Sequence, residues 1–140
     1  MVARKRALIG LAAGALSFIS GTAFAEALTV NVSNVRSANG IVRCGAKAFM
    51  NPGEEVYAAD ATISGGKAVC KFPNVTVGNY ALAAFHAEKN ERALEYGLFG
   101  KPKQGVGFSN NPSITFGAPS FEKARFGINK PTTLNIRLQY

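Results

Sequence analysis

The side chains that could carry out chemistry are few in this sequence. It has one histidine (His86), one aspartate (Asp60), two cysteines (Cys44 and Cys70) and seven glutamates. Zinc sites take most of their ligands from Cys and His, so three such residues barely suffice, and two of them are better explained as a disulfide. A Ser–His–Asp triad would have to use His86 with Asp60 or a Glu, and no serine lies in a G-x-S-x-G turn.

These counts favour a protein that is not an enzyme. The sequence contains no phosphate-binding loop and no dinucleotide-binding fingerprint. We therefore predict no catalytic residues, no metal site and no cofactor. The glutamates leave one enzymatic alternative open, a small envelope hydrolase that uses His86 with a Glu.

The N-terminus has the pattern of a secretory signal. Three basic residues at positions 4–6 precede an uncharged apolar run over residues 7–19, and Ala23-Phe24-Ala25 matches the signal-peptidase pattern. The run is shorter than the ~20 residues of a membrane-spanning helix. We expect residues 1–25 to be a signal peptide, residues 26–140 to form one domain without a transmembrane segment, and the protein to be exported to the periplasm or the extracellular space.

Export also bears on the cysteines, because paired cysteines are common in exported proteins and rare in the cytosol. Cys44 and Cys70 lie in the apolar runs 41–49 and 67–72. A bridge between them is the favoured interpretation. The alternative is two buried free thiols, which behave as small hydrophobic side chains.

Apolar and polar residues alternate with period two through most of the chain, which indicates strands with one buried face. The clearest runs are 28–33, 41–49, 67–72, 81–86, 124–128 and 134–138. Six or seven short strands separated by turn residues favour an all-β sandwich of about seven strands. The residues expected in its core are Leu28, Val30, Val32, Val69, Leu82, Phe126, Leu134, Ile136 and Leu138.

Three local signals refine this fold. Asn39-Gly40 lies between two apolar runs and predicts a hairpin turn. Pro73 is expected to end a strand, because proline has no amide to donate. Tyr80 shortly after Gly78 is typical of a tyrosine corner, in which the phenol bonds to nearby backbone.

Residues 87–122, called the insert below, do not follow the strand pattern. Residues 87–96 have a helix-like composition, and Gly97 could cap the helix. The remainder is rich in Gly and Pro, and the insert carries five aromatic residues: Tyr96, Phe99, Phe108, Phe116 and Phe121. Long connections in compact domains are either structured or functional. The rings could form a satellite core, or they could line a groove for a ligand or partner.

Four segments, in this order, carry a resemblance to a known family: residues 28–32, 78–86, 98–111 and 116–126. The third, Leu98-Phe99-Gly100-Lys101-Pro102 and onward to Asn111, is the most specific. Over about residues 27–140 the chain resembles the bacterial family called domain of unknown function 2141, small exported proteins of uncharacterised role. The resemblance implies an immunoglobulin-like or transthyretin-like sandwich and no particular activity.

One segment departs from the family's pattern. After the histidine, many members of the family that the chain resembles carry an acidic, Asn- and Gly-rich run of the D-x-N-x-N-x-x-L-D kind, a spacing that suits oxygen ligands around a hard cation. Here Ala87 occupies the first acidic position, and Lys89 and Arg92 bring positive charge. We therefore expect a helix in place of a cation site.

The full chain has a formal net charge of +8 and an isoelectric point near 9.8. This basicity could suit an anionic partner, but without a nucleic-acid-binding motif we expect no nucleic acid. The sequence favours a non-enzymatic binding or interaction module of the bacterial envelope whose partner is an unidentified envelope component. The candidate binding residues are His86, Phe99, Lys101, Lys103, Phe108, Asn110 and Asn111. Each also has a purely structural interpretation, as an edge histidine, a packed ring, a turn amide or a solubilising charge.

Overall fold

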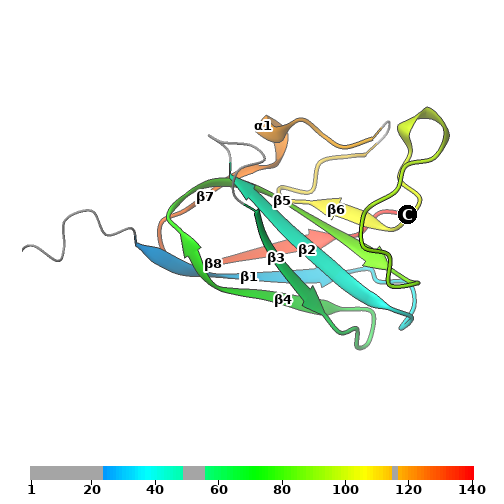
Figure 1. The fold of residues 1–140 in the computed structure, drawn as a ribbon, viewed down its shortest axis with the longest axis horizontal. Helices are drawn as coiled ribbons and strands as arrows, with labels where there is room; N and C mark the ends of the chain where they lie inside the picture. Colours follow the sequence, from blue (N-terminus) through cyan, green and yellow to red (C-terminus); the bar gives the residue numbers. More distant parts are fainter. Residues whose placement is uncertain (1–23, 49–55, 115–116) are drawn as a thin grey trace, which may run out of the picture.

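The computed structural model describes residues 24–48, 56–114 and 117–140, so the predicted signal peptide lies almost wholly outside the described residues. Within them, eight strands form two layered sheets (Figure 1). The strands are β1 (Ala25–Ser33), β2 (Ile41–Ala48), β3 (Val56–Ala61), β4 (Ala68–Thr76), β5 (Gly78–Ala87), β6 (Val106–Phe108), β7 (Arg125–Ile128) and β8 (Thr132–Arg137). The predicted all-β sandwich is confirmed.

The smaller sheet has the order β4-β1-β8, and the larger has the order β3-β2-β5-β6 with β7 also paired to β5. β1 and β8 run parallel, whereas the other pairs are antiparallel. Strand β5 pairs with β2 along one edge. Its other edge is shared, with β7 opposite residues 78–81 and β6 opposite residues 83–85. The insert therefore starts at the end of β5, and both β6 within it and β7 after it pair with one edge of that strand.

The core lies between the sheets and is formed by the alternating apolar residues of the strands. Leu28, Val30 and Val32 of β1 are buried, as predicted. In β4 the phase differs from the prediction. Val69 is 44 % exposed, and Ala68, Cys70 and Phe72 point inward instead. Because side chains alternate between faces, this one-residue difference moves the whole strand's set of side chains to the opposite faces.

A disulfide joins the two sheets through the core. Cys44 on β2 and Cys70 on β4 are both buried and bonded, with their Cα atoms 6.5 Å apart. The predicted tyrosine corner also forms, because the buried Tyr80 hydroxyl donates to the carbonyl of Thr76 at 2.6 Å.

The predicted hairpin at Asn39-Gly40 is wrong, because β1 and β2 belong to different sheets. The turn instead crosses from one layer to the other. Gly40 has a φ of 71°, and a Cβ there would lie 2.8 Å from the Ala87 carbonyl carbon. Glycine is required by this close approach to the end of β5, and not by a two-residue hairpin.

Pro73 does not end its strand, since β4 continues to Thr76. β4 is an edge strand, and its register with β1 shifts between Glu26 and Leu28, opposite Val75 and Phe72. A missing amide is tolerated at such an irregularity on an edge.

The helix predicted over residues 87–96 is also wrong. The only helices among the described residues are the short η2 (Leu98–Gly100) and α1 (Phe121–Ala124). Asn90 adopts a φ of 58°, which interrupts a helix. The Arg43 guanidinium, on β2, donates to the Glu91 carbonyl at 2.7 Å and is ion-paired with Asp60 at 2.8 Å. Contacts with distant residues therefore replace the local helical hydrogen bonds.

The disulfide leads to a stability prediction. It links residues 26 positions apart, so Cys44→Ala with Cys70→Ala should lower the free energy of unfolding by about 3–4 kcal/mol, because the unlinked chain gains entropy when unfolded. Urea denaturation of the variant and of the oxidised protein measures this. An oxidised protein whose intact mass did not change on reduction would contradict the bond itself.

Candidate functional site

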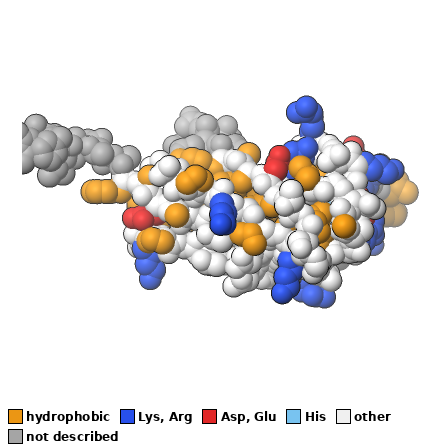
Figure 2. Space-filling view, turned by 90° about the horizontal axis from the view of Figure 1, so that it is seen from below, with side chains coloured by type: hydrophobic (Ala, Val, Ile, Leu, Met, Phe, Trp, Pro, Cys, Tyr) orange, Lys and Arg blue, Asp and Glu red, His pale blue; other side chains and the backbone are white. Residues whose placement is uncertain are grey.

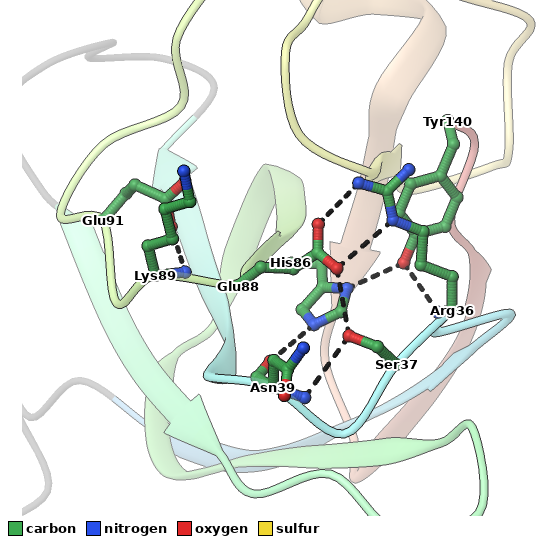
Figure 3. A network of polar contacts seen from close by, with 8 residues as sticks. All are labelled: Arg36, Ser37, Asn39, His86, Glu88, Lys89, Glu91 and Tyr140. Atoms are coloured by element: carbon green, nitrogen blue, oxygen red, sulfur yellow. Dashed lines mark hydrogen bonds and ion pairs between the residues drawn. The ribbon is translucent and has the colours of Figure 1, made fainter.

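His86 lies near the end of β5, where the insert begins, and its side chain is fully buried. Its Nε2 is 2.8 Å from the carbonyl oxygen of Asn39, and its Nδ1 is 2.9 Å from the hydroxyl of Tyr140 (Figure 3). A carbonyl can only accept, so Nε2 carries the proton and donates. The Tyr140 hydroxyl accepts from the Arg36 amide at 2.9 Å and can donate to Nδ1. A ring with its proton on Nε2 satisfies all these partners.

Tyr140 connects this network to the insert. Its ring lies against Gly105, where a Cβ would be 2.8 Å from the tyrosine Cδ2. The backbone of the same glycine accepts a hydrogen bond from the His86 amide at 2.8 Å. The Arg36 guanidinium carbon lies over the Tyr140 ring, 4.7 Å from its centre, in a cation–π arrangement. The last residue of the chain is therefore held at the base of the insert.

A surface ion pair borders the network. Arg36 binds both oxygens of Glu88, at 2.6 Å from Nη2 and 3.2 Å from Nε, and the Ser37 hydroxyl donates to the same carboxylate at 3.0 Å. The hydrogen bond from Arg36 is the main cause that holds the pKa of Glu88 below its ordinary value. Burial is the main cause that raises the pKa of Tyr140 above its ordinary value of 10.0. The phenol is protonated at neutral pH, as any tyrosine is, and can donate.

His86 is not hydrogen-bonded to a carboxylate among the described residues. Its two ring nitrogens contact the Asn39 carbonyl and the Tyr140 hydroxyl. Asp60, which a Ser–His–Asp triad would have to use, is in an ion pair with Arg43. Within the described ranges, no group of three or more His, Cys, Asp or Glu side chains could hold a metal ion.

The amides predicted to bind are also engaged within the protein. Asn110 and Asn111 have φ values of 70° and 49°, a conformation that asparagine tolerates better than most residues. The Asn110 side chain donates to the carbonyls of Lys123 and Arg125, at 3.0 and 2.8 Å. The Asn111 side chain donates to the carbonyl of Asn135 at 2.9 Å and accepts from the amide of Arg137 at 2.9 Å. Both side chains join the insert to the strands that follow it.

Ser109 is a structural residue that sequence reasoning missed. Its buried hydroxyl accepts from the Leu82 amide at 3.0 Å and contacts the carbonyl of Ala124. Leu82 lies where the edge of β5 passes from β7 to β6. The serine therefore fills the gap in the hydrogen-bonding of that edge, and the Ser-Asn-Asn sequence alone does not reveal it.

The two aromatic residues predicted to bind, Phe108 and Phe99, lie in different environments. Phe108 is 8 % exposed and packs with Val106 and Ala124 in a small second core. Its ring also borders an open, mainly apolar hollow of about 420 Å³ on the outer face of β2 and β5, below residues 118–124. Phe99 is 84 % exposed, as is its neighbour Leu98. The insert therefore buries one of the two candidate rings and presents the other to solvent.

Leu98 and Phe99 form the tip of a projecting loop, residues 95–103, called the finger below. In Figure 1 it is the yellow-green loop that extends past the sheets at the end where the C-terminus lies. Its two sides are joined by hydrogen bonds from the Gly97 amide to the Lys101 carbonyl (2.7 Å) and from the Lys103 amide to the Glu95 carbonyl (2.8 Å). The finger is thus an ordered, hairpin-like projection.

Gln104, which sequence reasoning did not single out, anchors the base of the finger. It is 6 % exposed. Its side-chain oxygen accepts from the Glu95 amide at 2.9 Å, and its nitrogen donates to the Ala93 carbonyl at 3.2 Å. The oxygen and the nitrogen of this buried side-chain amide are both hydrogen-bonded to the loop backbone. They hold the loop in place, because leaving either atom unpaired would cost free energy.

The two candidate lysines stand beside the tip. Lys101 and Lys103 are exposed, and neither is in an ion pair with another described residue. A Cβ at Gly97 would lie 3.8 Å from both Cγ and Cε of Lys103, so that side chain runs along the finger. Figure 2 shows Lys and Arg side chains gathered around protruding hydrophobic ones at the right-hand end, the end at which the finger projects in Figure 1.

Comparison with known families identifies the chain. A family model described as "Uncharacterized protein conserved in bacteria (DUF2141)" matches residues 30–135. The chain belongs to this family. Searches of curated proteins and of solved structures found no match. The DUF2141 match includes the whole finger, whereas Tyr140 lies beyond its end.

In this DUF2141 protein, no helix among the described residues has the length and apolar character needed to cross a membrane. The candidate site therefore consists of a buried polar network around His86, which holds the insert, and an exposed finger that carries three of the predicted binding residues: Phe99, Lys101 and Lys103.

The depressed pKa of Glu88 predicts a pH dependence. A carboxyl whose pKa is lowered by folding stabilises the folded state above its ordinary value of 4.5, and this contribution is lost as pH falls through the folded value. Glu88→Gln should therefore be less stable than the wild type at neutral pH, and the difference should vanish as the pH falls below the lowered pKa of Glu88. Urea midpoints measured across this range test it.

Glu122→Gln is the matched control, because the Glu122–Arg125 pair is exposed and screened by solvent. The dependence of its urea midpoint on pH should be the same as that of the wild type. A Glu88→Gln midpoint whose dependence on pH was also that of the wild type would contradict a stabilising role for the Arg36–Glu88 pair.

Proposed function

We propose that this DUF2141 protein is a non-enzymatic interaction module of the bacterial envelope, and that it binds its partner through the finger. The observation that carries the proposal is the exposure of two consecutive large apolar side chains, Leu98 and Phe99, on an ordered loop. Exposed apolar side chains that are held together on a projection are typical of interaction sites.

The backbone at the tip strengthens the argument. Phe99 has a φ of 60°, which is costly for a bulky side chain and which glycine or asparagine would adopt more easily. Among the described residues the ring buries little surface in return, since it is 84 % exposed. Strained, exposed residues of this kind cluster at functional sites. A binding role accounts for a phenylalanine that folding does not require.

Export is part of the proposal. The buried Cys44–Cys70 bridge suits an oxidising compartment, and the N-terminal pattern suits a cleaved signal. The hydrolase alternative receives no support from the geometry, because His86 is buried and both of its nitrogens serve structural partners. We propose no catalytic role for it.

The proposal predicts that the processed protein sediments with envelope fragments, the native mixture of membranes and their proteins, through the finger. Leu98→Ser with Phe99→Asn should reduce the co-sedimented fraction about tenfold, because both apolar contacts are removed. The melting temperature should not fall, since asparagine accepts the left-handed backbone at residue 99 more readily than phenylalanine does.

Val69→Thr with Val77→Thr is the matched control, because these exposed apolar residues lie outside the finger. The control should sediment like the wild type. Equal sedimentation of all three proteins would overturn the proposed function of the finger.

A further inference from the structure

The chemistry of the finger identifies one class of partner more closely. We propose that the finger is a membrane-docking element, which inserts Leu98 and Phe99 into the surface of an anionic lipid bilayer while Lys101 and Lys103 bind lipid phosphate groups. This inference rests on the proposed function and names the partner of the same site.

The order of side chains along the finger matches the layers of a bilayer surface. The two apolar residues occupy the tip, and the two lysines follow immediately behind it. At a membrane surface, apolar side chains enter the boundary of the acyl chains, and cationic side chains remain at the level of the head groups.

The charge of the finger favours an anionic surface. The finger carries two lysines behind its tip and one acidic residue, Glu95, at its base, so the segment from residue 96 to residue 103 is purely basic. Neither lysine is neutralised by an ion pair within the described part of the chain. Each basic residue close to an anionic membrane adds attraction that weakens with salt.

A bilayer explains more of these features than a soluble polyanion does. An acidic polysaccharide could pair with Lys101 and Lys103, but it offers no apolar layer for Leu98 and Phe99. A lipid surface accommodates both pairs of residues at once.

The finger is also suited to docking without rearrangement. Gln104 and the hydrogen-bonded amides of Gly97 and Lys103 hold the finger in one conformation. Little conformational entropy therefore remains to be lost when the tip enters lipid. A tip of two residues predicts weak, reversible binding that depends on salt.

A fluorescent reporter tests insertion directly, because the sequence contains no tryptophan. Phe99→Trp places a single indole at the tip. With processed protein and vesicles of phosphatidylglycerol and phosphatidylethanolamine, its emission should move to shorter wavelength. Phosphatidylcholine vesicles should cause no shift. Val77→Trp is the matched control and should not respond, because Val77 lies in the turn between β4 and β5, at the other end of the molecule (Figure 1).

Vesicle flotation of otherwise unmodified proteins measures the contribution of each pair of residues. Leu98→Ser with Phe99→Asn should weaken binding to the anionic vesicles about tenfold. Lys101→Gln with Lys103→Gln should weaken it by about tenfold at low salt and much less at high salt. Lys71→Gln with Lys130→Gln removes the same charge from exposed positions outside the finger and should have a smaller effect.

An unshifted Phe99→Trp spectrum, or wild-type flotation equal to that of the finger variants, would overturn membrane docking. If envelope fragments still retained the wild type and released the Leu98→Ser, Phe99→Asn variant, the partner would be a protein or glycan, and the proposed function would stand without the lipid. If neither envelope fragments nor vesicles distinguished the variants, both proposals would fail.

Discussion

The hydrogen-bonding demands of one buried imidazole determine how this domain closes. His86 has no exposed surface, so its two ring nitrogens need partners inside the protein. It finds them in the turn before β2, through Asn39, and in the last residue, Tyr140. Its own amide donates to Gly105. Three segments that are distant in sequence, the inter-sheet turn, the C-terminus and the second half of the insert, therefore meet at the end of β5.

This closure divides the insert into two parts with different roles. Ser109, Asn110 and Asn111 use their side chains to bind backbone of β5, β7 and β8, or of residues beside these strands. That part completes the edge of the larger sheet. The finger lies before it, anchored through Gln104 and free of the sheets at its tip. A rigid support that carries an exposed, strained apolar tip is the arrangement from which we infer binding.

Local patterns predicted much of the fold, and distant contacts account for what they missed. The alternation in β1, the Tyr80 corner and the cysteine pair depend on neighbouring residues or on composition, and all three agree with the structure. The helix over residues 87–96 failed because Arg36 and Arg43 bind Glu88 and the Glu91 carbonyl. In the site, Phe99 and Phe108 look alike in the sequence. Only the place of Phe108 in β6, where it packs against β5 and Ala124, distinguishes the buried ring from the exposed one.

The central claim is that the finger is ordered while its apolar tip faces solvent. Amide hydrogen exchange resolved by residue tests this most directly, because the Gly97 and Lys103 amides are bonded to the Lys101 and Glu95 carbonyls across the finger. We predict that both amides exchange much more slowly than in an unfolded peptide. Exchange of both at the unfolded rate, with the β5 amides still protected, would contradict the account.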